Sequence, residues 1–353
     1  MRGSRPDRRP SPAARIGLLV FLLILPLLSL ELGVRVLIAT DRLPVAGAHA
    51  PEFEVTWQNL SRLGTADVLI LGDSVSQQSI EPAVLSAQLE QELGRPVSVF
   101  NAASPGGRMG VSRVMVEELA REGRLPRVAI VGVFTGTLKE DETYRFFFSL
   151  TPMGGLFSDC ERWLGYAAQL DCRFGNVSAA WRWRGHPDRI LQALATTVPR
   201  HLFSGGLLLR EDGFREGRGA SLAKLQAQMD SADLRRRLFV FPADARQDYV
   251  RLIDVLRSHG VAIVPVAIPD TPPMTERLEQ MQPGRHQLFR QALDVLEEDT
   301  GLAFVDPVAF GSWWGDGMAR NFVHLSAAGA VKFTRQLWRM PEFRDGVLAR
   351  LAD

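Results

Sequence analysis

Two side chains near opposite ends of the sequence, Ser74 and His324, are of the types needed for nucleophilic catalysis. A serine hydroxyl is a weak nucleophile at neutral pH, and it becomes reactive when an adjacent imidazole takes its proton. Each residue also has an ordinary structural explanation, since serine often caps a helix and a lone histidine is more often structural than catalytic. Whether the two side chains can come into contact depends on the predicted strands, helices and loops that carry them.

Ser74 follows a short apolar run, Val68–Leu71, bounded by polar residues. Such a run is typical of a strand buried on both faces of a parallel sheet. Gly72 permits a tight turn directly after it. Ser74 is therefore expected just beyond the strand's carboxyl end, the edge at which open α/β sheets bind ligands.

His324 follows the last predicted strand, at 302–305, and precedes a predicted closing helix at 326–338. A loop in this position lies at the same edge of the sheet as Ser74. The placement favours Ser74 and His324 as a nucleophile and its general base.

Strands and helices alternate along most of the chain, which predicts an α/β fold with a parallel sheet covered by helices. The helix punctuation is clearest at 81–93, where Pro82 lies near the start and Gly94 just past the end. The predicted strands are 68–71, 97–100, 127–134, 261–268 and 302–305, and the predicted helices are 81–93, 111–121, 244–259, 285–298 and 326–338.

Three sequence blocks together resemble those of the SGNH (GDSL) hydrolase family. They are Gly-Asp-Ser-Val at 72–75, Asn-Ala-Ala-Ser-Pro-Gly-Gly at 101–107, and Asn-x-x-His-Leu-Ser-x-x-Gly at 321–329. The resemblance covers roughly 67–337, apart from an insertion at about 139–238. It implies a three-layer sandwich with a five-stranded parallel sheet in the order 2-1-3-4-5. It also implies acyl-ester hydrolysis or transfer through a covalent acyl-serine.

By this resemblance Ser74 is the nucleophile and His324 the general base. The backbone amides of Ser74 and Gly106 would hold the developing oxyanion. The last block departs from the family pattern, because position 321 is Asn where Asp is usual. An amide can orient the imidazole but cannot stabilise imidazolium by charge. Asp306 or Asp316, upstream of His324, could supply a carboxylate instead.

The third block of the family, Gly-x-Asn-Asp, also differs. It reads Gly-Val-Phe-Thr-Gly-Thr at 132–137, so the asparagine that donates to the oxyanion is absent and Thr135 or Thr137 could replace it. These departures motivate a second hypothesis, a non-catalytic relative that serves as a binding or assembly module. Retention of the serine and the histidine favours the enzyme.

The first forty residues predict a membrane anchor. Five arginines within the first fifteen residues precede 16–39, and the first fifteen residues of this span carry no charge. A helix over 16–39 would be roughly 36 Å long, enough to cross a bilayer core. The preceding arginines place 1–15 in the cytoplasm and the rest of the chain outside it. A cleavable signal peptide is the rival interpretation, because Ala48-His49-Ala50 has the small-x-small pattern, although it lies far beyond the uncharged run.

The anchor, with Glu31 and Arg35 near its end, resembles the membrane-anchored branch that includes alginate-type polysaccharide O-acetyltransferases and proteins that assist D-alanylation of teichoic acids. That resemblance implies a single-pass protein of the bacterial inner membrane with a periplasmic or extracellular catalytic domain. It further implies O-acyl, chiefly O-acetyl, groups of a polysaccharide as substrate and a membrane-embedded acyltransferase as partner. The predicted organisation is a tail at 1–15, an anchor at 16–39, a linker at 40–66 and the catalytic domain at 67–353.

The two cysteines, Cys160 and Cys172, fall in the insertion on the predicted exported side. An oxidising compartment favours a disulfide between them, and the absence of nearby histidines makes a zinc site a poor alternative. Two separate buried thiols remain the other interpretation. The insertion is rich in aromatic residues and arginine, and could form a lid over the active edge.

Composition excludes other classes of function. The 41 basic and 40 acidic residues leave a formal charge of +1, which gives no basic face for nucleic acid. The sequence contains no His-Glu-x-x-His metalloprotease motif, no Walker loop and no Gly-x-Ser-x-Gly elbow. No cofactor or metal is therefore expected.

Overall fold

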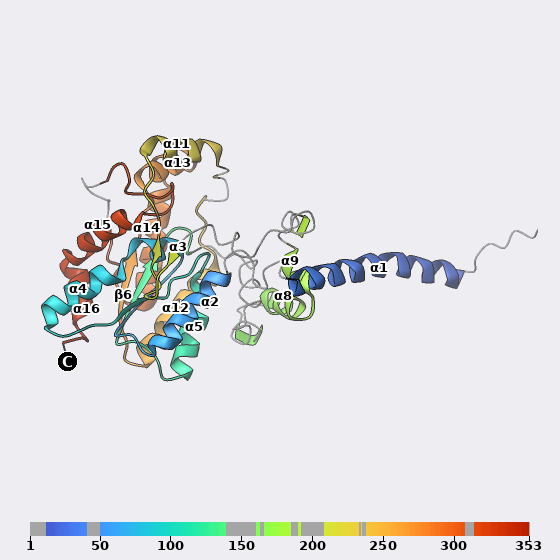
Figure 1. Cartoon of the computed structure of the whole chain (residues 1–353), viewed down its shortest axis with the longest axis horizontal. Helices are drawn as coiled ribbons and strands as arrows, with labels where there is room; N and C mark the ends of the chain where they lie inside the picture. The colour runs from blue at the N-terminus through green and yellow to red at the C-terminus, as the bar shows by residue number, and fades with distance from the viewer. Residues whose placement is uncertain are drawn as a thin grey trace, which may run out of the picture.

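The structure is a computed structural model of the 353-residue chain, and it describes residues 12–40, 50–138, 160–162, 166–184, 190–191, 208–232, 234, 238–307 and 314–352. The body of the molecule is a parallel β-sheet between two layers of helices (Figure 1). Helix α1 (Pro12–Ala39) extends away from this body, next to α8 and α9. The predicted α/β class and its three layers agree with this arrangement.

The sheet consists of four parallel strands in the order β2-β1-β3-β6. The strands are β1 (Val68–Leu71), β2 (Val99–Asn101), β3 (Val128–Val133) and β6 (Ala262–Ala267). Strand β1 is central, with Val68 opposite Val99 on one side and Val128 on the other. A parallel sheet places all four carboxyl ends at one edge, so the residue that follows each strand joins the same surface.

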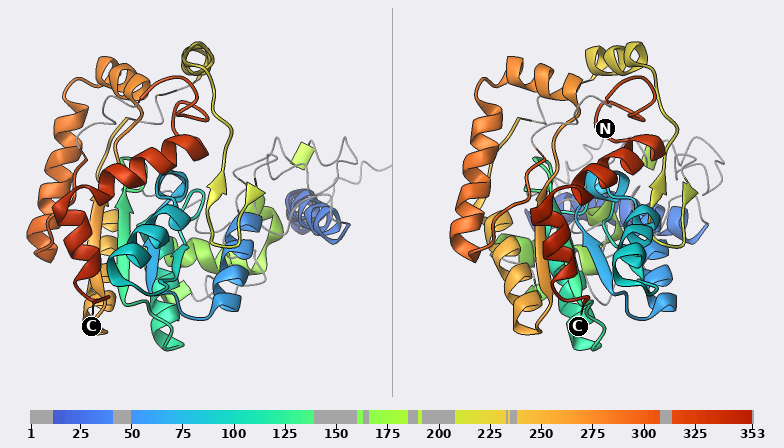
Figure 2. Two further views of the ribbon diagram at one scale, coloured as in Figure 1. Left: turned by 60° about the vertical axis from the view of Figure 1, so that its left-hand side comes forward. Right: turned by 90° about the vertical axis from the view of Figure 1, so that its left-hand side faces the viewer.

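Alternate residues of the strands supply two separate cores. Leu69 and Leu71 of β1 face one core, and Val68 and Ile70 face the other. The first core is covered by α2 (Ala50–Leu63), α5 (Met109–Arg121), α12 (Ala243–Ser258) and α14 (Arg285–Thr300). The second is covered by α3 (Ser74–Ser79), α4 (Pro82–Leu93), α13 (Pro272–Met281), α15 (Ala327–Trp338) and α16 (Pro341–Leu348). Figure 2 shows these two layers from the side.

Helix punctuation in the sequence correctly predicted the helix that follows the Ser74 segment. Helix α4 begins at Pro82, with the Glu81 side chain accepting the Ala83 N–H, and ends at Gly94 in the left-handed conformation. Proline fits the first turn because a backbone N–H there would have no partner within the helix, so its absence costs nothing. Glycine takes a positive φ without a steric penalty. Helix α2 occupies much of the stretch predicted as a linker, and it buries Phe53, Trp57 and Leu60 along one face.

The predicted five-stranded sheet is wrong, because the segment 302–305 does not form a full fifth strand. Only Val305 pairs with β6, through one parallel bridge to Val266. The Val305 N–H donates to the Pro265 carbonyl, and the Val305 carbonyl accepts the Ala267 N–H, both at 2.9 Å. The next bond toward the start of the ladder would need an N–H on Pro265, which proline lacks. The imino acid in β6 therefore limits this edge of the sheet to a single bridge.

The predicted membrane-spanning anchor and the inner-membrane location are also wrong. Within the described ranges, no helix combines the length and the apolar character needed to cross a bilayer. The second half of α1 instead makes polar contacts with the chain. The Glu31 carboxylate accepts the N–H groups of Ala179 and Ala180 at 2.9 Å each and the Ser178 hydroxyl at 2.8 Å.

Glu31 thus caps α9 (Ala179–Trp183) from outside and also pairs with Arg35 at 2.6 Å. Burial opposes ionisation of Glu31, but the hydrogen bonds from the Ala180 and Ala179 amides, the Ser178 hydroxyl and Arg35 outweigh it and lower its pKa to about 2. Val34 and Leu37 of α1 pack with Ala179 and Trp183. The end of α1 is therefore part of a small cluster of helices.

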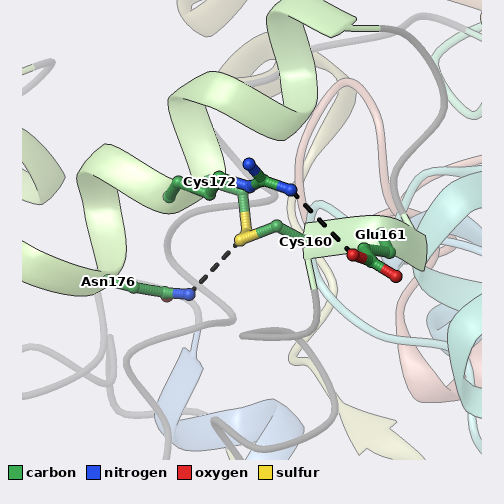
Figure 3. The surroundings of a disulfide bond; sticks show 5 residues. Cys160, Glu161, Cys172 and Asn176 are labelled. Atoms are coloured by element: carbon green, nitrogen blue, oxygen red, sulfur yellow. Dashed lines mark hydrogen bonds and ion pairs between the residues drawn. A yellow bond between two sulfur atoms is a disulfide. The ribbon is translucent and has the colours of Figure 1, made fainter.

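The predicted disulfide between Cys160 and Cys172 is confirmed, and it closes a separation of 12 residues. It joins the short 3-10 helix η1 (Cys160–Arg162) to α8 (Tyr166–Val177), as Figure 3 shows. Asn176, one turn further along α8, donates to the Cys160 sulfur at 3.3 Å. About half of the predicted insertion at 139–238, the segment proposed as a lid, lies outside the described residues, and so does most of the predicted tail at 1–15.

Three further elements belong to the insertion. Strands β4 (Leu208–Leu209) and β5 (Arg215–Glu216) form a small antiparallel ladder, and α11 is Leu222–Ser231. The Asp212 carbonyl in the turn of this ladder accepts the Asn101 N–H at 2.8 Å. The turn therefore covers part of the open edge of β2.

Candidate active site

Ser74 and His324 meet at the carboxyl edge of the sheet. The Ser74 Oγ lies 2.9 Å from the His324 Nε2. Ser74 is the first residue of α3, directly beyond β1, and His324 lies in the loop that leads into α15. The two residues are 250 positions apart in the chain. Parallel topology therefore places the predicted nucleophile and the predicted base within hydrogen-bond reach.

Asp73, and not Ser74, caps the helix that follows β1. Its carboxylate accepts the N–H of Val75 at 2.9 Å and that of Ser76 at 3.3 Å. The cap leaves the Ser74 hydroxyl available to His324. The structural explanation of Ser74 as a capping residue does not hold.

The turn before Ser74 requires glycine. Gly72 has a φ of +139°, and a Cβ there would collide with the Ser76 side chain and come within 2.7 Å of the Gly132 carbonyl. Only a residue without a side chain permits this close approach of the first and third strand ends. The backbone of Ser74 is thereby fixed relative to the neighbouring strand.

Asn321 organises the loop that carries His324. Its Oδ1 accepts the N–H groups of Val323 and His324 at 2.9 Å each and lies 3.1 Å from the His324 Nδ1. An Nδ1–H donated to this oxygen leaves Nε2 free to accept the Ser74 proton, a tautomer assigned from the hydrogen-bond network. Asn321 thus holds the imidazole in the orientation that a general base needs.

The loop is also fixed at both sides of His324. The Thr271 hydroxyl donates to the Phe322 carbonyl at 2.5 Å, and Ala319 pairs with Leu325 in an antiparallel bridge. Ser326 then caps α15 by accepting the Gly329 N–H at 3.1 Å. The Ser and the Gly of the last sequence block are therefore a helix cap and its partner.

The two alternative acids have other partners. Asp306 accepts from Arg290 at 3.2 Å, and Asp316 accepts the Leu222 N–H at 2.7 Å. Both nitrogens of the His324 ring are already occupied, Nε2 by Ser74 and Nδ1 by Asn321. The geometry therefore gives the orienting position to Asn321, and not to a carboxylate.

The predicted oxyanion residues lie in loops that touch each other. The Gly72 carbonyl accepts the Ser104 N–H at 3.1 Å, and Gly107 N donates to the Ser104 carbonyl at 2.8 Å. Gly106 takes a positive φ of +69° in this turn. Across the described parts of the chain, neither the Ser74 N–H nor the Gly106 N–H donates to a protein acceptor. Both amides are thus left for another acceptor, as an oxyanion site requires.

The two threonines proposed as replacement donors are engaged elsewhere. Thr135 Oγ1 accepts from Arg285 Nη2 at 2.7 Å. Thr137 Oγ1 accepts the Phe134 N–H at 3.0 Å and hydrogen-bonds to Asp73. The third loop therefore braces the first one through Thr137.

Asp73 and Arg108 are functional candidates that the sequence did not single out. Burial raises the pKa of Asp73, while the charge of Arg108, the Val75 and Ser76 amides and the Thr137 hydroxyl act against that rise. Arg108 also donates to the Gly136 carbonyl. The Asp73 carboxylate and the Arg108 guanidinium therefore link the loops after β1, β2 and β3. A carboxylate directly before a helix was a visible capping signal, whereas the influence of the Arg108 charge on it is non-local.

The described residues contain no group of three or more His, Cys, Asp or Glu side chains arranged to hold a metal ion. No family model matches the chain, and no curated protein matches its sequence. Among solved structures, the fold is similar to the crystal structure of a protein named TesA, at 13% identity and a TM-score of 0.39. The match covers 79% of this chain and 98% of that one. At this level of similarity no argument about function rests on it.

Proposed function

We propose that this chain is a serine-dependent acyl-ester hydrolase or O-acyltransferase of the SGNH type. The single observation that carries the proposal is the 2.9 Å contact between Ser74 Oγ and His324 Nε2. The contact lies in the range in which an imidazole can take a proton from a hydroxyl. The sequence blocks around both residues support the same chemistry.

In the proposed reaction, His324 Nε2 takes the Ser74 proton as Oγ attacks the carbonyl carbon of an ester. The tetrahedral oxyanion accepts hydrogen bonds from the Ser74 and Gly106 amides. His324 then gives its proton to the leaving alcohol as the carbon–oxygen bond breaks, and an acyl-serine remains. In the second half, the oxygen of water or of an acceptor alcohol attacks the acyl carbon as its proton passes to His324 Nε2. His324 then returns this proton to Ser74 Oγ as the bond between Oγ and the acyl carbon breaks, which releases the acid or the new ester.

Whether the acceptor is water or a second alcohol distinguishes hydrolysis from transfer. The three motif blocks support ester chemistry without naming a substrate. O-acyl groups of a polysaccharide as substrate and a membrane-embedded acyltransferase as donor stay predictions, since both came from the resemblance of the predicted anchor.

Labelling with a fluorophosphonate probe tests the proposal directly. The full chain is expected to react once, at Ser74, and peptide mapping identifies the site. Ser76 provides a matched control, because it lies two residues away in the same helix and donates to the Gly132 carbonyl at 3.3 Å. A Ser76→Ala variant should still be labelled, whereas Ser74→Ala should not.

A binding or assembly module is the second candidate, and two observations favour it. Asn321 brings no charge to the imidazole, and both threonines of the third loop are already engaged. Absence of labelling in a folded wild-type chain, together with no cleavage of p-nitrophenyl acetate, would reject the enzyme and support this module.

A further inference from the structure

A pocket of about 550 Å³ lies against the edge strand β2, and neither Ser74 nor His324 lines it. The floor of the pocket is the chain at 97–100. The turn at 210–214 between β4 and β5, called the ladder turn below, closes one end, and Figure 2 shows the ladder in yellow beside the blue helix α2. The walls come from α2 and the start of α4, through Asn59, Arg62, Leu63, Pro82, Ala83 and Ser86.

The open backbone groups of the pocket floor belong to Val99. The Val68 N–H donates to the Ser98 carbonyl, so Ser98 faces β1 and Val99 faces away from it. The Asn101 N–H points to the same side as Val99 and donates to the Asp212 carbonyl. Within the described residues, the N–H and the carbonyl of Val99 have no partner on that side. Open backbone groups at a sheet edge are a template for one more strand.

Two exposed side chains of opposite charge lie at the two ends of the pocket. Glu211 belongs to the ladder turn, which meets β2 at its carboxyl end. Arg62 lies in the last turn of α2, and the chain runs from there directly into the amino end of β1. In the described part of the chain neither residue forms an ion pair, whereas Asp212 is paired with Arg210. The pocket is therefore negative at one end and positive at the other.

These features set the direction of an added strand. The ladder turn already takes the Asn101 N–H, so an added chain begins or ends beside Val99. A terminal carboxylate there would be repelled by Glu211, whereas a terminal ammonium is attracted. A chain that begins there runs toward Arg62, antiparallel to β2. In an antiparallel pair one residue exchanges both hydrogen bonds with the residue opposite, which satisfies the Val99 N–H and carbonyl together.

We propose that this pocket binds the amino-terminal end of an extended peptide, antiparallel to β2. Its ammonium lies beside Glu211, its second residue pairs with Val99, and a carboxylate about two residues further on lies near Arg62. Leu63, Pro82 and Ala83 offer apolar surface to its side chains. The site goes beyond the proposed ester chemistry and does not depend on it.

Saturation-transfer NMR titration of the full chain with the peptide Ala-Val-Ala-Ala, free at both ends, tests the backbone pairing. Methylation of the backbone nitrogen of its second residue removes the bond to the Val99 carbonyl and should weaken binding at least about tenfold. Methylation at the third residue, whose N–H points away from β2, should change binding by less than about threefold. Equal losses, or a larger loss at the third residue, would overturn the proposal.

The charged ends of the peptide are tested in the same way. Acetylation of the amino terminus removes the charge that faces Glu211 and adds bulk at the closed end, so it should weaken binding at least about fivefold. Glu211→Gln should reduce this difference between the free and the acetylated peptide. Unchanged binding after acetylation would overturn the proposal. Absence of binding at millimolar peptide, as expected if another part of the chain fills the pocket, would overturn it as well.

Two exposed alanines one turn apart in α4 provide matched variants. Ala83 lines the pocket and Ala87 does not. Ala83→Trp should weaken binding of Ala-Val-Ala-Ala at least about tenfold by filling the pocket, and Ala87→Trp should leave it within about twofold. Equal effects of the two variants would place the peptide elsewhere and overturn the assignment. Fluorophosphonate labelling of Ser74 in the same samples reports on the proposed function separately, since peptide binding needs no catalysis.

Discussion

The Asn321 side-chain oxygen lies 3.1 Å from the His324 ring and accepts the backbone N–H of the same histidine at 2.9 Å. One neutral amide therefore both shapes the loop and orients the base. In a Ser-His-Asp hydrolase this position holds a carboxylate, which also stabilises the imidazolium that forms during the reaction. The structure separates these two roles, because only orientation is available to Asn321.

Asn321→Asp should therefore raise kcat for p-nitrophenyl acetate by about tenfold. The carboxylate keeps the three contacts as acceptor and adds charge stabilisation of the imidazolium. Asn321→Ala removes all three contacts and should lower kcat by about 10² to 10⁴. Circular dichroism checks that each variant is folded. A folded Asp variant that is slower than the wild type would contradict this account.

Ser74→Ala and His324→Ala should each reduce kcat by roughly 10⁴ to 10⁶, because nucleophile and base act as one unit. For the same reason the double variant should be hardly slower than either single one. Steady-state kinetics on one ester measures all three. Multiplicative losses in the double variant would mean that the two residues act independently.

Arg108→Gln should lower the free energy of unfolding by about 1–2 kcal/mol at neutral pH, because it leaves the buried Asp73 carboxylate with less compensation. The raised pKa of Asp73 means that protonation relieves a burial penalty in the folded state. The loss should therefore be largest above the folded-state pKa of Asp73 and should shrink as the pH falls through it.

Denaturant unfolding at several pH values measures the Arg108 effect, and Arg108→Lys is the control because it keeps the charge. The lysine variant should recover part of the stability at neutral pH. A loss that is the same at every pH would show that Arg108 acts through the Gly136 carbonyl and not through Asp73.

Replacing both Cys160 and Cys172 by Ser should lower the free energy of unfolding by about 3 kcal/mol if the segment unfolds with the rest of the chain, as the chain-entropy model gives for a loop of this size. Thermal unfolding of the oxidised wild type and the double variant measures the difference. Reduced wild type should match the variant. Two titratable thiols in unreduced protein would contradict the bond itself.

Glu31→Gln should weaken the contact between α1 and α9 in a pH-dependent way. The folded-state pKa of about 2 lies below the ordinary value of 4.5, so ionised Glu31 stabilises the contact fully above about pH 4.5. That stabilisation is lost as the pH falls toward 2. Hydrogen exchange at the Ala179 and Ala180 amides, corrected for intrinsic rates, reports it. The Gln variant should lack this pH dependence.

Local chemistry made much of the fold predictable. The strand before Ser74, the cap and terminal glycine of α4, and the Ser326 cap of α15 all follow from side-chain types within a few residues. The approach of Ser74 to His324 was also predictable, since carboxyl ends of parallel strands share one edge. The catalytic roles of the two residues stay predictions.

The errors came from interactions between distant residues. A run of apolar residues predicted a membrane span, but the hydrogen bonds that Glu31 accepts from the Ser178 hydroxyl and from the first two amides of α9 are invisible in hydropathy. The segment at 302–305 has strand composition, and its pairing is limited by Pro265 in another strand. The interactions of Asp73 with the charge of Arg108 and with the Thr137 hydroxyl likewise depend on three loops that only the folded sheet brings together.

The separation of 250 positions between Ser74 and His324 also sets the order of events during synthesis. Ribosomes add about 5–20 residues per second, so the histidine emerges roughly 12 to 50 s after the serine. Throughout that interval the hydroxyl has no imidazole beside it and is no more reactive than any other serine. Ser74 therefore does not react with cellular esters while the chain is being made. It becomes reactive only when the segment 302–305 and α15 have packed against the sheet and brought His324 to it.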